Sequence, residues 1–121
     1  MIQIIQLKGT DRRLYELVAP LVMNPDVLKQ NYNYPFRTSE DFVWFVAVEK
    51  RKVIGFIPVE EKKKECIINN YYVEDNNEST LKLLLEKVIS NATAGKELTS
   101  VTFMEHCSLF KELGFSEEKV W

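Results

Sequence analysis

Apolar and polar residues alternate at the start of the chain and then change to a helical spacing. Residues 2–7 predict a short strand. The leucines and valines of residues 14–21 recur every three or four positions, which predicts a helix whose last turn is weakened by Pro20. Asn24 followed by Pro25 is typical of a second helix start, because proline suits the first helical position. The chain therefore begins as a strand followed by two helices.

The next apolar segments have the composition of strands. FVWFVAVE and VIGFIPV are rich in aromatic and β-branched residues and flank a polar EKRK turn, so residues 42–60 predict an antiparallel hairpin. Pro58 indicates a bulge or a sheet edge. CIINNYYV predicts a third strand at residues 66–73, in which Asn69 and Asn70 either contact a ligand or bridge a bulge.

A second strand–helix alternation follows. The apolar positions of residues 81–89 predict a helix with one broad apolar face, and Asn91 and Gly95 mark its end. ELTSVTFM predicts a strand parallel to residues 66–73, because strand, helix and strand in succession form a βαβ unit. HCSLFKELGF predicts a short helix ending at Gly114, and residues 115–121 predict a last short strand.

Length and composition fit one domain over residues 1–121, with 45% hydrophobic and 28% charged residues. The formal net charge of -2 provides no basic field for nucleic acid or an anionic membrane. Cys66 and Cys107 lack a CxxC spacing and His106 is the one histidine, so neither a disulfide framework nor a metal site is expected. The N-terminus does not resemble a secretion signal, and no apolar run reaches the length of a membrane span. We therefore expect a cytoplasmic protein.

Three segments together are similar to motifs of a known family. VEKRKVIGFIPV resembles a strand turn of the GNAT (Gcn5-related N-acetyltransferase) family, YYVEDNNESTLKLLLEKV occupies the place of its acetyl-CoA motif, and LFKELGF is similar to its FYEKLGF helix end. The chain resembles a short and divergent member. The resemblance implies an α/β (α+β) fold with a mixed, mostly antiparallel central sheet, about four helices and an incomplete C-terminal strand pair. It also implies transfer of an acetyl group from acetyl-CoA to a small-molecule or peptide amine.

The resemblance places the acetyl-CoA site in the turn after residues 66–73. In the family, a V-x-P step and an R/Q-x-x-G-x-G/A turn present backbone N–H groups to the pyrophosphate at a helix N-terminus. Val73 matches, but the turn after it contains no proline, basic residue or glycine. Asn76 and Asn77 can replace glycines, because asparagine tolerates a left-handed backbone. The residues that the resemblance assigns to cofactor binding are Tyr72, Val73, Asn76, Asn77, Ser79, Thr80 and Phe110.

Three acids in the same turn oppose an anion. A carboxylate about 6 Å from a phosphate charge opposes binding by roughly 3 kcal/mol at an effective dielectric constant of about 20, against roughly 0.3–1 kcal/mol gained from a helix N-terminus. Glu74, Asp75 and Glu78 therefore either point away from the site, or the turn does not bind pyrophosphate strongly. In the second case Asp75 with Glu78, or Asn76 with Ser79, are helix-capping residues.

The sequence assigns no catalytic residue. Many family members have a tyrosine at the position of Phe110 that returns a proton to the CoA thiolate, and phenylalanine cannot donate one. Candidates for the base that accepts the amine proton are Glu49, Glu60, Tyr71 and Tyr72, and none stands out. Two functions are therefore open: an N-acetyltransferase, or a non-catalytic interaction or regulatory module whose CoA site has decayed.

Two features near the C-terminus have simpler interpretations. His106 and Cys107 are adjacent, and neighbours on a helix seldom face each other, so we do not interpret them as a base and a nucleophile. Cys107 is either a packing residue or part of the lining of the groove in which a pantetheine arm would run. The resemblance implies that, with the chain ending at Trp121, the family's C-terminal strand pair has at most one strand and leaves a sheet edge open. A homodimer through this edge and a short charged strand left in water are the alternatives.

Overall fold

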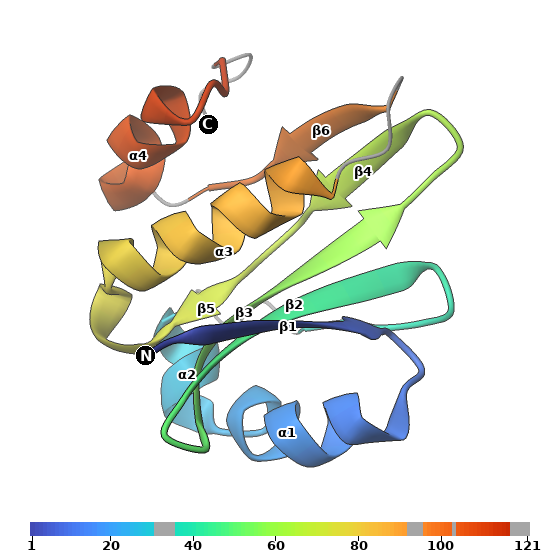
Figure 1. Cartoon of the computed structure of the whole chain (residues 1–121), viewed down its shortest axis with the longest axis vertical. Coiled ribbons are helices and arrows are strands. Elements are labelled where there is room, and N and C mark those ends of the chain that lie inside the picture. Colours follow the sequence, from blue (N-terminus) through green and yellow to red (C-terminus); the bar gives the residue numbers. More distant parts are fainter. Residues whose placement is uncertain (31–35, 92–95, 103, 117–121) are drawn as a thin grey trace.

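The computed structural model describes residues 1–30, 36–91, 96–102 and 104–116. In these residues six strands form one mixed sheet, with two helices on each face (Figure 1). The strands are β1 (Gln3–Lys8), β2 (Phe42–Glu49), β3 (Lys52–Glu61), β4 (Glu65–Ile68), β5 (Tyr72–Val73) and β6 (Glu97–Ser100). The α-helices are α1 (Arg12–Val22), α2 (Pro25–Gln30), α3 (Glu78–Ser90) and α4 (Cys107–Glu112).

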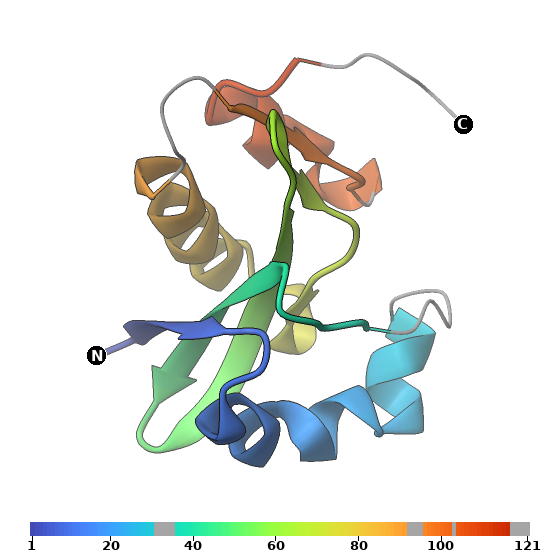
Figure 2. The same ribbon diagram turned by 90° about the vertical axis from the view of Figure 1, so that its right-hand side faces the viewer.

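The order of strands across the sheet is β1-β2-β3-β4-β6, and β5 pairs with β3 beyond the end of β4. Pairing is antiparallel except between β4 and β6. The predicted mixed, mostly antiparallel α+β fold is therefore confirmed. Figure 2 shows the layers from the side, with α3 and α1 on opposite faces of the sheet.

The alternation of side chains along β2 divides the core between the two faces. Trp44 and Val46 belong to the cluster that packs with α1, whereas Phe45 and Ala47 belong to the cluster that packs with α3 and α4. Successive side chains of a strand point to opposite faces, so an almost continuous apolar segment such as FVWFVAVE requires cover on both. The helices supply that cover.

Helix α1 begins and ends close to the predicted residues. The Asp11 side chain accepts a hydrogen bond from the Arg13 amide at 2.8 Å and caps the first turn. Leu14 and Val18 are the buried residues of its inner face. The helix continues through Pro20 to Val22, and α2 begins at Pro25 as predicted.

The strand predicted at residues 66–73 is interrupted, which corrects that prediction. Cys66 pairs with Glu61 and Ile67 with Glu60, but Tyr72 pairs with Phe56, so the register against β3 shifts by one residue. Residues 69–71 therefore contain a β-bulge, the local irregularity that one extra residue produces in a strand. The bulge explains Asn69 and Asn70 in an apolar segment.

Pro58 lies in the interior strand β3 and not at a sheet edge. It pairs with Trp44 of β2, and the pairs of β3 with β4 and β5 stop on either side of it, at Glu60 and Phe56. Pro58 thus lies opposite the bulge, where the loss of a backbone N–H removes no ladder hydrogen bond. The predicted association of Pro58 with a bulge is confirmed.

The predicted βαβ unit is present, because β4, α3 and β6 follow one another and β4 pairs in parallel with β6. The predicted strand at residues 97–104 is shorter, since β6 ends at Ser100 and Met104–His106 form a 3-10 turn before α4. The predicted last strand falls mainly on residues 117–121, which lie outside the described residues. The incomplete strand pair and the dimer edge remain predictions.

Candidate functional site

The two parallel strands separate at one end of the sheet. The pairing of β4 with β6 runs from Glu65–Glu97 to Ile68–Ser100, and a bond of 2.9 Å from the Val101 amide to the Ile68 carbonyl follows it. Beyond this bond the segment that follows β4 continues through the bulge into β5, and β5 pairs with β3 alone. The segment that follows β6 leads towards α4 (Figure 1). The strands therefore diverge at the bulge.

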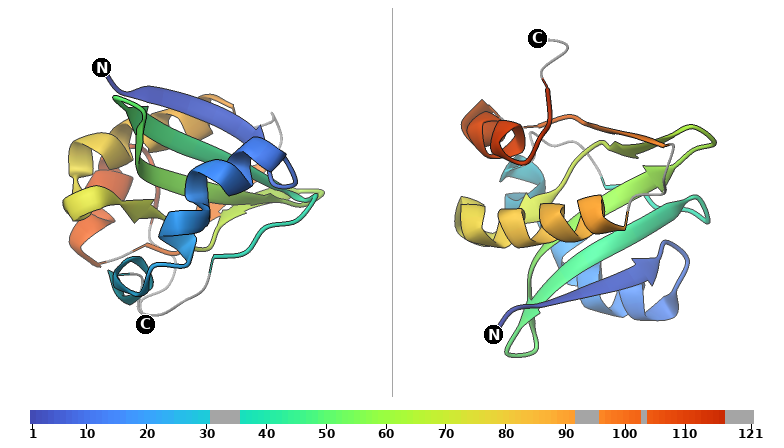
Figure 3. Two further views of the ribbon diagram at one scale, coloured as in Figure 1. Left: turned by 90° about the horizontal axis from the view of Figure 1, so that it is seen from below. Right: turned by 45° about the horizontal axis from the view of Figure 1, so that its top comes forward.

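The first half of α3 lies beside this divergence. α3 crosses the sheet, and α4 lies next to its N-terminal half (Figure 3). Lys82 of α3 and Glu112 of α4 form an ion pair with a distance of 3.8 Å between Nζ and Oε1. The diverging strands, the start of α3 and α4 thus surround one region, and the candidate site is built from their residues.

Tyr71 connects the two diverging segments, the one that follows β4 and the one that follows β6. Its hydroxyl lies 2.7 Å from Nδ1 of His106 and 3.1 Å from the hydroxyl of Thr102, so a residue of the bulge is hydrogen-bonded to the segment between β6 and α4. Tyr71 and His106 are each only 1% exposed. The Tyr71 ring centroid also lies 5.8 Å from that of Phe110. The sequence predicted no contact between these residues.

Burial lowers the pKa of His106 below its ordinary value, because removing an imidazolium from water disfavours the charged form. Glu105 and Glu78 act in the opposite direction and only partly offset the burial. His106 is therefore a neutral imidazole at pH 7. A neutral ring has one nitrogen that accepts and one that donates, which allows Nδ1 to accept from the Tyr71 hydroxyl.

The turn between β5 and α3 contains two residues with left-handed backbone. Residues Glu74–Asn76 form a 3-10 turn in which φ is 56° at Asp75 and 53° at Asn76. Asn76 therefore adopts the conformation expected of it, whereas Asn77 does not, with φ at -67°. Asp75 takes the second left-handed position. Short polar side chains tolerate this region better than other non-glycine residues.

Asn77 is the N-cap of α3, which corrects the expected capping pairs. Its side-chain oxygen accepts a hydrogen bond from the Thr80 amide at 3.2 Å, three residues further along the chain. Neither Asp75 nor Asn76 caps the helix. Within the described residues, the amides of Glu78 and Ser79 have no acceptor, as is usual in the first turn of a helix. These two N–H groups are available to an anion.

Two neighbouring segments hold the turn. Nε2 of Gln30, at the end of α2, donates to Oδ1 of Asn76 at 2.8 Å. Nζ of Lys52, at the start of β3, lies 2.6 Å from Oε1 of Glu74. The hydrogen bond and charge of Glu74 raise the pKa of Lys52, so the lysine stays protonated and offsets the carboxylate. One of the three acids that oppose an anion is therefore paired with a cation.

Six of the seven sequence-assigned site residues lie in one segment, residues 72–80, and the seventh, Phe110, lies on α4. Tyr72 is half-buried with its ring 5.5 Å from that of Phe56, and burial and then the charge of Glu74 raise its pKa. Val73 and Thr80 are buried, and Asn76, Asn77 and Ser79 are exposed. Phe110 lies in the core, with its ring 5.1 Å from that of Phe115.

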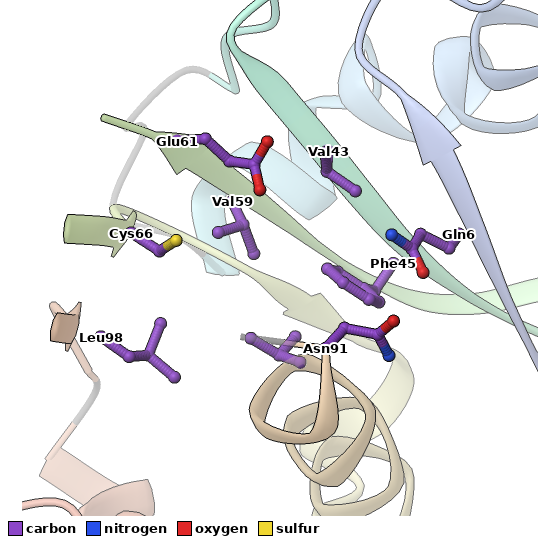
Figure 4. Close-up of a pocket in the computed structure, with 9 residues that line it drawn as sticks. Gln6, Val43, Phe45, Val59, Glu61, Cys66, Asn91 and Leu98 are labelled. Atoms are coloured by element: carbon purple, nitrogen blue, oxygen red, sulfur yellow. The ribbon is translucent and has the colours of Figure 1, made fainter. Parts of the chain in front are cut away.

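A small cavity lies at the other end of α3 and is separate from this site. Figure 4 shows it between Asn91 and strands of the sheet, about 20 Å along the helix from the turn by the rise of 1.5 Å per residue. Its volume is about 20 Å³, enough for one water molecule. Burial raises the pKa of the Cys66 thiol that lines it. The lining residues are Gln6, Val43, Phe45, Val59, Glu61, Cys66, Val88, Asn91 and Leu98.

Two other kinds of feature were searched for in the described ranges. Residues 1–30, 36–91, 96–102 and 104–116 contain no group of three or more His, Cys, Asp or Glu side chains placed to hold a metal ion. In the same ranges, no helix combines the length and the apolar character that crossing a bilayer requires.

The fold is shared with known acetyltransferases, although no protein-family model and no curated protein matches the sequence. An aminoglycoside acetyltransferase from an uncultured soil metagenomic sample has a TM-score of 0.68 and 20% identity, over 100% of this chain and 95% of that chain. A GNAT family acetyltransferase from Streptococcus pneumoniae has a TM-score of 0.66 and 14% identity, over 100% and 97% of the two chains. YhhK of Escherichia coli, a candidate N-acetyltransferase solved with bound coenzyme A, has a TM-score of 0.65 and 14% identity, over 98% and 94%.

These likenesses establish the fold of this chain as that of the GNAT acetyltransferases, as the sequence resemblance predicted. Two connections in the candidate site had no signal in the sequence. The Tyr71–His106 and Lys52–Glu74 contacts each join segments that are distant in the chain. Only the unusual polar residues next to an apolar strand, Asn69 and Asn70, marked the place where the bulge forms.

Proposed function

We propose that this protein is an N-acetyltransferase that moves an acetyl group from acetyl-CoA to an amine. The observation that carries the proposal is the divergence of β4 and β6 beside the capped start of α3, in a fold that YhhK uses to bind coenzyme A. An open end between parallel strands next to a helix N-terminus is a common place for a phosphate-bearing ligand.

The proposed site for the pyrophosphate is the turn at the start of α3. The amides of Glu78 and Ser79 lie at the positive end of the helix, and Asn76 has a left-handed backbone in the turn that precedes it. Tyr72, Val73, Asn77, Thr80 and Phe110 complete the proposed cofactor-binding set. The pairing of Glu74 with Lys52 lowers the electrostatic opposition that the turn's acids present.

The proposed acceptor is an amine on a small molecule or a peptide. Several solved structures with this fold are described as aminoglycoside acetyltransferases, and one was solved in complex with sisomicin. The reaction itself needs only a neutral amine near the thioester carbonyl, because the amine is the nucleophile. A panel of primary amines that includes sisomicin is therefore the first screen for an acceptor.

The second function is a non-catalytic module with the same fold. The observation that favours it is Phe110, which is buried in the core and has no proton to give to a leaving thiolate. A homodimer through the C-terminal edge belongs to this alternative. Coenzyme A binding separates the two functions, because only the transferase requires it.

The test is a thermal-shift titration with coenzyme A and with acetyl-CoA. Ligand at about 100 times its dissociation constant adds about 2.7 kcal/mol to the free energy of unfolding, which raises the melting temperature measurably. The variant Glu74→Gln removes a negative charge from the turn and frees Lys52, so we expect coenzyme A to bind about three to ten times more tightly.

The matched control is Glu86→Gln, the same substitution at an exposed position about two turns further along α3, which should leave the affinity unchanged. A protein whose melting temperature does not move with millimolar coenzyme A refutes the transferase proposal. Equal affinities for Glu74→Gln and wild type would show that the pyrophosphate does not lie at this turn.

A further inference from the structure

Strand β1 forms one edge of the sheet and lies along the margin of the molecule (Figure 3, left). The bond of 2.8 Å from the Gly9 amide to the Phe42 carbonyl continues the pairing of β1 with β2. The bonds of an antiparallel ladder recur at every second residue, so the odd-numbered residues of β1 bond to β2 and the even-numbered ones point outwards. The outward N–H and C=O groups of Ile4 and Gln6 have no hydrogen-bond partner among the residues that the structure describes.

β1 lacks the features that usually prevent an edge strand from pairing with another chain. Protected edge strands are short, or they carry a proline, a bulge or several charged side chains. β1 spans 6 residues, QIIQLK, and Lys8 at its end is its one charged residue. Its register against β2 runs from Gln3 to Lys8 without a shift. An edge of this kind can accept a further strand.

The side chains beside the open backbone are apolar. Ile2 and Ile4 pack against the core cluster on the α3 face of the sheet, and Ile5 packs against the cluster on the α1 face. All three are half-buried, so part of each isoleucine remains in water. A strand placed about 4.8 Å from β1 would cover them on both faces. Backbone and side chains therefore favour the same partner, an extended segment.

We propose that a second copy of this chain provides that segment, through antiparallel pairing of β1 with β1 about a two-fold axis at Ile5. Ile4 of one copy exchanges both backbone hydrogen bonds with Gln6 of the other, and the axis repeats this exchange. The two sheets then form one continuous sheet. A two-fold interface uses the same patch on both copies, so a single contact satisfies both open edges.

The charge pattern of β1 favours a second copy in this arrangement. Antiparallel pairing about Ile5 places Lys8 of each copy opposite Ile2 of the other, so the two ammonium groups lie at opposite ends of the paired strands. Parallel pairing in register would bring the two lysines side by side, which is unfavourable. The remaining pairs are between neutral side chains, such as Gln3 with Leu7. β1 is therefore complementary to itself.

The proposed interface lies away from the candidate site. β1 and β6 are at opposite ends of the strand order, and the candidate site lies where β4 and β6 diverge (Figure 1). The dimer is therefore compatible with either proposed function and does not rest on coenzyme A binding. It also differs from the homodimer predicted from the sequence, which would use the C-terminal edge.

The first test measures the mass of the protein in solution by sedimentation velocity at micromolar and submillimolar concentrations. We expect a dimer of twice the monomer mass of 14.2 kDa at the higher concentration. Gln6→Pro removes an outward N–H and costs no bond to β2, so circular dichroism should show a folded protein. Its dimer dissociation constant should rise by at least about 100-fold. Gln6→Thr, the matched control, keeps the N–H and should change this constant by less than about threefold.

The second test does not depend on the folding of a proline variant. At the axis, the two Ile5 residues form a pair without backbone bonds, whose Cα atoms lie about 4.5 Å apart. Ile5→Cys should therefore form a disulfide-linked dimer on mild oxidation. Gln3→Cys is the matched control, because its two Cα atoms would lie about 13 Å apart, roughly four residues along the strands. Wild type, in which Cys66 is buried and Cys107 half-buried, should stay unlinked.

The outcomes separate this interface from the alternatives. A wild-type protein that stays monomeric at submillimolar concentration overturns the proposal, and so does a dimer that a folded Gln6→Pro leaves intact. Loss of the dimer on deletion of residues 116–121, with no effect of Gln6→Pro, would assign it to the C-terminal edge instead. Equal crosslinking of Gln3→Cys and Ile5→Cys would refute the two-fold axis at Ile5. Dissociation by Gln6→Pro together with crosslinking of Ile5→Cys alone supports the proposal.

Discussion

Gly55 of β3 lies where the backbone of β5 approaches most closely, and an added methyl group there has a definable effect. Gly55 pairs with Val73. A Cβ at this position would lie 2.8 Å from the Tyr72 carbonyl oxygen, 3.0 Å from Cγ1 of Val73 and 3.3 Å from Cδ1 of Leu84. The first contact is with backbone, so no side-chain rotation relieves it. β5 must move away from β3.

The expected magnitude follows from overpacking. Inserting a methylene-sized group into a well-packed core costs about 1–3 kcal/mol. For a chain of this length each kcal/mol lowers the melting temperature by roughly 3–6 °C, so Gly55→Ala should melt about 3–18 °C below wild type. Because β5 leads directly into the turn before α3, the same displacement should weaken coenzyme A binding.

The assay combines urea unfolding, calorimetric melting and titration with coenzyme A. Gly114→Ala is the matched control, since its Cβ has no described atom within 4 Å and its strain comes from a φ of 103°. It should lose about 1 kcal/mol without altering coenzyme A affinity. If Gly55→Ala unfolds within about 0.5 kcal/mol of wild type and binds coenzyme A equally well, the close approach of β3 and β5 is wrong.

Two other perturbations test single side chains. His106 is the one histidine of the chain, and burial depresses its pKa below the ordinary 6.5, so the folded state resists protonation. The stability that this neutral ring contributes is present above pH 6.5 and is lost as the pH falls towards the folded pKa. The free energy of unfolding by urea should therefore fall between pH 7.5 and 5.5 more in wild type than in His106→Gln, and equal slopes would contradict the burial of the imidazole. Asn77→Ala removes the cap of α3 and should lower the free energy of unfolding by about 1 kcal/mol, whereas Ser79→Ala, at an exposed neighbour without a capping bond, should change it little; equal losses would show that Asn77 is not the cap.

The local pattern of the sequence was sufficient for most of the fold. The spacing of apolar residues predicted α1 and α3, and the two aromatic and β-branched segments predicted the β2–β3 hairpin. Each of these elements forms because it buries the apolar side chains on one face. The spacing of those side chains, every second residue in a strand and every 3.6 residues in a helix, can be read from the sequence. The parallel pairing of β4 with β6 followed from the order strand, helix, strand.

The sequence was less informative about the turn before α3. It showed that glycines are replaced and that three acids are present, but it assigned the cap to the wrong residues. Asp75, Asn76 and Asn77 are all suited to left-handed backbone and to capping, so their own preferences do not decide between them. The contact of Asn76 with Gln30 and the pairing of Glu74 with Lys52 fix the arrangement.

The sequence alone determined the scaffold of this protein, because the local spacing of apolar residues shows which helices and strands form and which of their faces are buried. The tertiary structure decided where the polar groups of the core meet. Tyr71 and His106 are separated by 35 residues in the sequence and by 2.7 Å in the fold. A hydrogen bond depends on the relative placement of two backbones to within a fraction of an ångström, and no local pattern carries that information.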